Sequence, residues 1–94
     1  MPEADVVVSE VIIFEDKDFL KAHKHIFQRE DDIGAPPSGF ASGVSSLVVR
    51  GKPWVFFAEK DCTGPATTVK PGAYNRVQLV GIPNDRIRSL RPAD

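Results

Sequence analysis

The 94-residue chain is 41% hydrophobic and 27% charged, which is typical of one small globular domain and excludes both a disordered chain and two separate cores. Twelve Lys and Arg residues against 13 Asp and Glu give a formal net charge of −1, so no overall field attracts nucleic acid or an anionic membrane. Cys62 is the single cysteine, which excludes a disulfide within one chain.

The start of the chain carries no targeting signal that we recognise. No apolar run approaches the ~20 residues that span a bilayer. Met1–Asp5 is short and acidic, unlike the basic and apolar start of a signal peptide. We therefore expect a soluble chain in which residues 1–9 form an N-terminal extension.

Short runs rich in Val, Ile, Phe and Thr, separated by prolines and glycines, favour strands over helices along the whole chain. In chain order the predicted strands are Glu10–Phe14, Ala22–Phe27, Val44–Arg50, Trp54–Phe57, Ala66–Lys70, Arg76–Val80 and Arg86–Arg91. Asp16–His25 is also a candidate helical window, although strand signals flank it. Residues 29–40 could hold a short helical turn, but their Gly and Pro residues place a loop there in any fold.

The chain contains an internal repeat. A shift of about 43 residues aligns chemically matched positions over much of its length, placing Phe14 on Phe57 and Ser46 on Ser89. Two repeats of this size cannot each bury a hydrophobic face alone, so they should pack together into one sandwich. The repeat thus predicts two four-stranded sheets with pseudo-two-fold symmetry.

The repeated segments resemble the motifs of the βγ-crystallin family. The family motif opens with an aromatic-rich hairpin, matched by residues 14–19 and 54–64, and closes with a calcium-binding hexapeptide, matched by residues 41–46 and 84–89. Pro71–Tyr74, followed by Gly81–Pro83, is similar to the second motif of single-domain microbial members. The resemblance implies an all-β, βγ-crystallin-like sandwich of two four-stranded Greek-key motifs, in one domain of residues 10–94, with motif one at about 10–50 and motif two at about 53–92.

The resemblance also implies calcium binding, since family members build two calcium sites by exchanging ligands between the two hexapeptides. One site would take the Glu15 and Gly43 carbonyls, the Ser45 hydroxyl and the Asp85 carboxylate. All four groups are present in this sequence. With one certain carboxylate among several neutral ligands, binding is expected to be weak.

The second site implied by the resemblance would take the Ala58 and Arg86 carbonyls and the side chains of residues 42 and 88. Ser42 brings no charge there, and Arg88 offers only donors whose positive charge repels a divalent ion. We therefore predict that Arg88 disables this site and puts its own charge where calcium would sit.

Simpler explanations exist for several of these residues. Ser45, Ser46 and Ser89 could bond to loop backbone instead of calcium, and Asp85 could cap its loop as an Asx turn.

The two hairpins also differ. Lys21 stands in the first where Gly64 stands in the second, and Gly at that place normally serves a positive φ. The first hairpin is therefore predicted to be strained or differently folded.

Cys62 stands at a position that is aromatic in the family pattern, and it is interpreted as an inert, buried or half-buried thiol. The remaining aromatic residues are interpreted as core and Tyr-corner positions, namely Trp54, Phe56, Phe57 and Tyr74.

Three charged or metal-ligating features stand outside the hexapeptides. His23 and His25 would face the same way on a strand, at a spacing that could hold zinc or nickel. Because two ligands lack a third, we favour an exposed polar strand face. The acidic run Glu30–Asp32 is interpreted as a solvated turn, and the arginines at 86, 88 and 91 as protection of an edge strand.

No nucleophile with a base, and no carboxylate pair in a cleft, can be identified in the sequence, so no reaction is predicted. The expected protein is a non-enzymatic, calcium-binding structural domain, a monomer or weak homodimer, with calcium as its partner and no nucleic acid or membrane. Two alternatives remain, both on the same fold: a calcium-independent scaffold, and a proteinase-inhibitor or antimicrobial binding module, although such modules usually carry disulfides.

Overall fold

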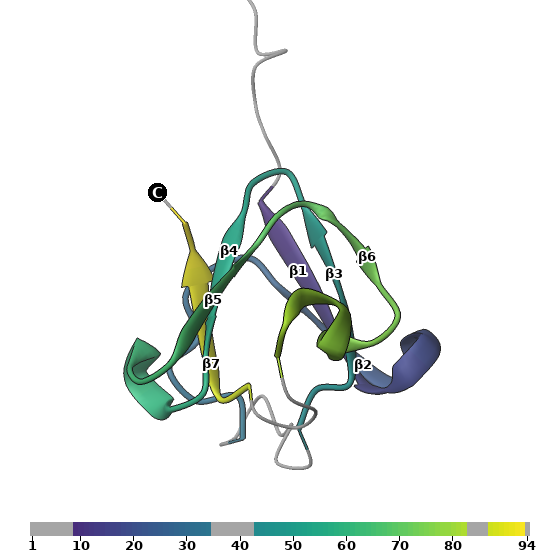
Figure 1. Ribbon diagram of the computed structural model, residues 1–94, viewed down its shortest axis with the longest axis horizontal. Helices are drawn as coiled ribbons and strands as arrows, with labels where there is room; N and C mark the ends of the chain where they lie inside the picture. Colours follow the sequence, from purple (N-terminus) through teal and green to yellow (C-terminus); the bar gives the residue numbers. More distant parts are fainter. Residues whose placement is uncertain (1–8, 35–42, 83–86, 94) are drawn as a thin grey trace, which may run out of the picture.

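Two antiparallel sheets face each other in a computed structural model that describes residues 9–34, 43–82 and 87–93. The first sheet has the strand order β2-β1-β3-β6, and the second has the order β5-β4-β7 (Figure 1). The strands in these residues are β1 (Glu10–Asp16), β2 (Leu20–Ile26), β3 (Ser46–Arg50), β4 (Trp54–Phe57), β5 (Ala66–Val69), β6 (Gly72–Tyr74) and β7 (Ser89–Pro92). The same part of the chain contains the short 3-10 helices η2 (Lys17–Phe19), η3 (Lys60–Cys62) and η4 (Val77–Val80).

The two motifs exchange one segment each, which makes both of them Greek keys. β6 belongs to the second motif but pairs with β3 of the first, with Leu47 opposite Tyr74. Glu30 of the first motif correspondingly bridges Leu90 in β7, with backbone hydrogen bonds of 2.9 and 3.0 Å. The predicted all-β Greek-key sandwich is therefore confirmed. The prediction of two four-stranded sheets holds for the first sheet only, because in the described residues the second sheet has three strands and the Glu30–Leu90 bridge stands in place of a fourth.

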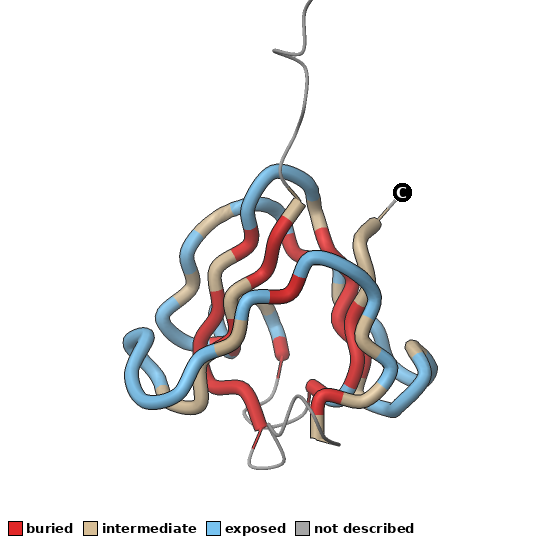
Figure 2. Tube along the Cα trace, turned by 180° about the vertical axis from the view of Figure 1, so that it is seen from behind, coloured by how far each residue is buried: buried red, intermediate tan, exposed pale blue. Residues whose placement is uncertain are grey.

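The core lies between the sheets. In Figure 2 the buried residues are concentrated along the strands, and the exposed residues lie mostly along the connecting segments. The period of two along β1 produces this division, because Val11 and Ile13 are fully buried while Ile12 between them is not. Trp54 and Phe56 supply the largest side chains, and Tyr74 packs against the same cluster and donates from its hydroxyl to the Lys70 carbonyl at 2.8 Å. The aromatic residues thus form core and a Tyr corner, as predicted.

The predicted strand at Arg76–Val80 is wrong. This segment forms the 3-10 helix η4, which lies near one end of the sandwich between the two sheets (Figure 1). Val77 is buried and Val80 packs against the core, so the apolar contacts recur every three residues, as in a 3-10 helix, and not every two. Gly81 closes the helix at φ 84° and donates to the Gln78 carbonyl.

The other predicted strands match observed strands with shifts at their ends, and Trp54–Phe57 matches without any shift. The prediction missed β6, whose residues follow the turn-forming Pro71. The candidate helix at Asp16–His25 is also wrong, because η2 occupies three residues of it and β2 most of the rest. None of the helices in the described part of the chain is long and apolar enough to cross a membrane.

Candidate metal sites

The two hairpins that precede the candidate metal sites fold back in the same way. η2 and η3 lie on opposite flanks of the sandwich (Figure 1), and the middle residue of each, Asp18 and Asp61, has φ 60°. Lys21 has φ 66° where Gly64 has φ 79°. The first hairpin is therefore not differently folded, and Lys21 adopts the left-handed conformation that a residue with a Cβ normally avoids.

The last serine of each hexapeptide fastens its hairpin. The Ser46 hydroxyl donates to the Asp16 carbonyl at 2.5 Å and accepts from the Phe19 N–H at 3.0 Å. The Ser89 hydroxyl repeats both bonds in the second motif, to Glu59 at 2.5 Å and from Cys62 at 2.9 Å. Both serines are fully buried. The alternative to calcium binding, hydrogen bonding to the loop backbone, is thus confirmed for Ser46 and Ser89.

The side chain of Cys62 is a partly exposed free thiol.

The first candidate site lies where β1, β3 and η4 meet. Ser45 is 8% exposed, and its backbone is held by the Phe14 carbonyl at 3.0 Å and by the Val77 N–H at 2.9 Å. Gly43 is buried with φ 96°, and Glu15 takes part in neither strand register of β1. Three of the four predicted groups therefore lie in this region, whereas Asp85 lies outside the described residues.

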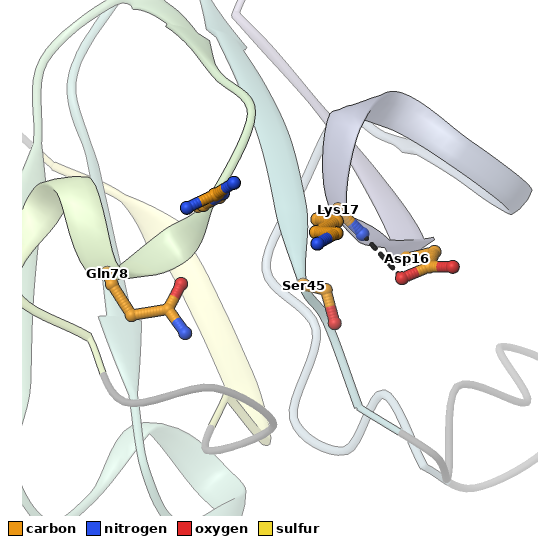
Figure 3. A pocket seen from close by; sticks show the side chains of 5 residues that line it. Asp16, Lys17, Ser45 and Gln78 are labelled. Carbon is orange, nitrogen blue, oxygen red and sulfur yellow. Dashed lines mark hydrogen bonds between the residues drawn. The ribbon is translucent and has the colours of Figure 1, made fainter.

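Ser45 lines a pocket of about 220 Å³ together with Asp16, Lys17, Arg76 and Gln78. In Figure 3, Gln78 of η4 lies on the side opposite Asp16, Lys17 and Ser45. The Asp16 carboxylate accepts a hydrogen bond from the Lys17 N–H at 2.8 Å. Oxygen atoms that could bind a hard cation are thus present. Lys17 and Arg76 bring two positive charges to the same pocket, and neither charge was predicted from the sequence.

The repeat offers a signal for one of these cations. Lys17 is the first residue of η2, and Lys60 is the first residue of η3 at the equivalent place in the repeat. Each candidate site therefore has a lysine beside it. Arg76 has no charged counterpart in the first motif, where the repeat places Ile33. Its position near Ser45 depends on how η4 packs between the sheets, which the repeat does not predict.

The second candidate site contains a cluster of ion pairs. Arg88 lies 4.0 Å from the Asp32 carboxylate, and Lys60 lies 4.0 Å from the other oxygen of that carboxylate. Ala58 is nearby at the end of β4, with its N–H on the Pro65 carbonyl. Arg86 and Ser42 lie outside the described residues. Arg88 is therefore paired with a carboxylate that the sequence analysis had assigned to a solvated turn.

The neighbouring residues of that acidic run also contact the second hairpin. The Asp31 carbonyl accepts from the Asp61 N–H at 2.7 Å, and the Asp31 carboxylate accepts from Arg29 Nε at 2.5 Å. This hydrogen bond and the charge of Asp31 raise the pKa of the Arg29 guanidinium. The acidic run thus links the two motifs and is more than a solvated turn.

Within residues 9–34, 43–82 and 87–93, no group of three or more His, Cys, Asp or Glu side chains is placed to hold a metal ion. The Asp85 carboxylate, which the family pattern assigns to the first site, lies outside these residues.

Two Greek keys, exchanged segments and serine-fastened hairpins define a double Greek-key sandwich of the crystallin class. The family Beta/Gamma crystallin matches residues 10–93 of the chain. The chain therefore belongs to the βγ-crystallin family, as its motifs predicted. No match is found among curated proteins.

Solved structures of βγ-crystallins resemble this fold closely. A βγ-crystallin from Ciona intestinalis has 26% identity and a TM-score of 0.83, over 89% of this chain and 99% of its own. A βγ-crystallin from an archaeon has 26% identity and a TM-score of 0.81, over 92% and 99%. A transition-metal-ion-binding βγ-crystallin from Methanosaeta thermophila has 30% identity and a TM-score of 0.77, over 88% and 99%.

Proposed function

We propose that this protein is a non-enzymatic structural βγ-crystallin domain that binds one calcium ion weakly, through Glu15, Gly43, Ser45 and Asp85. The observation that carries the proposal is the oxygen-lined pocket at Ser45, to which Asp16 and Gln78 also contribute. Calcium prefers carboxylate, carbonyl and hydroxyl oxygens, and it tolerates irregular geometry. A relative of 30% identity is described as a transition-metal-ion-binding βγ-crystallin, which supports metal-ion binding in general and not calcium in particular.

Calcium is expected at the first site alone. At the second site the Arg88 guanidinium forms an ion pair with Asp32 at 4.0 Å, and a divalent ion placed beside the guanidinium would be repelled. At the first site, Lys17 and Arg76 lower the affinity without occupying a ligand position. One carboxylate and two nearby cations together favour a dissociation constant at the weak end of the calcium range, on the order of 10⁻⁴–10⁻³ M.

Titration calorimetry of metal-stripped, tag-free protein with calcium tests the proposal. One equivalent should bind, Asp85→Ala should abolish the heat, and Ser42→Ala should leave it unchanged, since Ser42 belongs to the disabled site. At a free calcium concentration 100 times the dissociation constant, linkage should raise the free energy of unfolding by about 2.7 kcal/mol.

A different result separates the alternatives. An absence of both heat and thermal stabilisation would leave a calcium-independent scaffold, which is one of the two alternatives given by the sequence. Two equivalents would show that Arg88 does not disable the second site.

A further inference from the structure

The exposed face of the edge strand β2 carries both histidines of the chain. His23 and His25 lie opposite Phe14 and Ile12 of β1, and both are exposed. Their rings are 5.3 Å apart between centroids, at an interplanar angle of 74°. Since residues two apart on a strand point to the same side, the two imidazoles form a pair directed away from the core.

The spacing of the rings fits one shared metal ion. Two imidazole nitrogens that each lie ~2.0–2.1 Å from one tetrahedral ion bring their ring centroids to about 5.2 Å from each other. The observed 5.3 Å matches the centroid separation that two rings on one ion would have.

A buried carboxylate orients one of these rings. Glu10 Oε2 lies 2.5 Å from Nδ1 of His25, and the Glu10 side chain is 5% exposed, against 49% for His25. Because a carboxylate accepts, Nδ1 carries the proton of the neutral ring, and the lone pair of Nε2 is left for a metal. Metal-binding histidines commonly donate their other N–H to a carboxylate in this way.

The orienting carboxylate is itself held in place. Arg50 donates to the other oxygen of Glu10 at 3.0 Å, so the Glu10 charge is balanced whether or not His25 is protonated. His23 is restricted as well, because its ring packs on that of Phe14 with centroids 5.6 Å apart and an interplanar angle of 32°. Both rings are therefore partly preorganised before any ion arrives.

We propose that His23 and His25 form a two-histidine site for a tetrahedral divalent transition-metal ion such as Zn²⁺, with Glu10 as a positioning residue and water completing the coordination. The site shares no residue with the calcium site and does not depend on it. Two neutral nitrogen ligands select borderline metals over Ca²⁺ and Mg²⁺, which prefer oxygen. The open positions make the site accessible and its affinity modest.

The test is a titration of tag-free, metal-stripped protein with Zn²⁺, followed by the NMR signals of the two imidazoles, which belong only to His23 and His25. Both sets of signals should shift together and saturate near one equivalent, and a tenfold excess of Mg²⁺ should not move them. His23→Ala should weaken binding at least tenfold. Glu10→Gln should weaken it 10–100-fold, the range for residues that orient a ligand.

Two variants serve as controls. Lys24→Gln changes the residue between the histidines without removing an imidazole, and Asp85→Ala removes the carboxylate of the calcium site, so both should keep full Zn²⁺ binding. If Glu10→Gln or His25→Ala fails to fold, His23→Ala alone decides, because His23 is exposed and the aromatic rings beside it in the described residues are those of Phe14 and His25. Imidazole signals that do not respond to Zn²⁺, binding that survives His23→Ala, or binding that is lost in Asp85→Ala would each overturn the proposal.

Discussion

Replacing Gly64 by alanine should destabilise the domain by about 2 kcal/mol. Gly64 has φ +79°, and a Cβ added there would lie 2.5 Å from Cγ and 3.3 Å from Cβ of Glu59. The left-handed conformation costs an L-residue about 1–2 kcal/mol, and turning the Glu59 side chain away from a preferred rotamer costs about 0.5–1.5 kcal/mol more. Alanine also makes the unfolded chain less flexible, which offsets these costs by about 0.4–1 kcal/mol.

A comparison with the first hairpin separates the steric cost, which can be relieved, from the cost of the left-handed backbone conformation, which cannot. Lys21 carries a Cβ at the equivalent place with φ 66°. Its neighbour Asp16 turns its carboxylate onto the Lys17 N–H, whereas Glu59 makes no such side-chain bond. Glu59→Ala removes the atom at 2.5 Å and leaves the Cβ contact at 3.3 Å, so most of the steric part of the cost should disappear in that background, in which Gly64→Ala should lose only about 1 kcal/mol. The left-handed conformation would still have to be adopted.

Urea unfolding followed by fluorescence measures both effects, because Trp54 is the single tryptophan and is fully buried. In a domain of this size, about 2 kcal/mol corresponds to a fall of roughly 8–16 °C in the melting temperature. A loss below about 0.5 kcal/mol in Gly64→Ala, or equal losses with and without Glu59, would refute the reasoning from backbone strain and steric overlap.

Four further substitutions test the hairpins and the two candidate sites. Ser46→Ala and Ser89→Ala each remove two part-buried hydrogen bonds, worth about 0.5–1.5 kcal/mol each, so each should cost about 1–3 kcal/mol in urea unfolding; losses within experimental error would contradict the role of these serines in holding the hairpins. Arg88→Ser should cost only about 0.5 kcal/mol without calcium, since the Asp32 pair is partly exposed, and the loss should vanish in 1 M salt; a salt-independent loss would argue against an ionic role. Arg76→Gln should tighten calcium binding several-fold in calorimetry, and unchanged affinity would show that its charge does not reach the ion.

Most strands could be predicted because their signals are local. Trp54–Phe57 is a β-rich run bounded by Pro53 and Ala58, and its observed limits are those predicted. The repeat then supplied the architecture, since Ser46 and Ser89 make the same pair of bonds in their two motifs. Local composition and internal repetition were thus sufficient for the fold class.

The segments that were mispredicted depend on packing against distant residues. Val77–Val80 is rich in β-branched residues, yet the Val77 N–H bonds to the Ser45 carbonyl and Leu79 is 65% exposed. β6 was missed because Pro71 and Gly72 indicate a turn, and it forms only because β3 offers an edge for pairing. In both cases tertiary contacts overrode the local preference.

The candidate sites were predictable to the extent that motif positions determine them. Ser45 and Arg88 were identified from the hexapeptides, but their neighbours were not. Asp32 reaches Arg88 from the other motif, and Glu10 reaches His25 across paired strands. Contacts between residues so far apart in sequence need the register of the sheet or the path of a connecting segment, which composition does not give.

The positions within each hexapeptide explain how one motif can lose a calcium ligand without losing its fold. The sixth residue, Ser46 or Ser89, fastens the hairpin from inside the protein. The fifth residue, Ser45 or Arg88, is the one that the family pattern assigns to calcium. Successive residues of an extended chain point to opposite sides, so a change at the fifth position leaves the fastening serine untouched. Arg88 can therefore replace a ligand and pair with Asp32 while the second hairpin keeps the same two hydrogen bonds as the first.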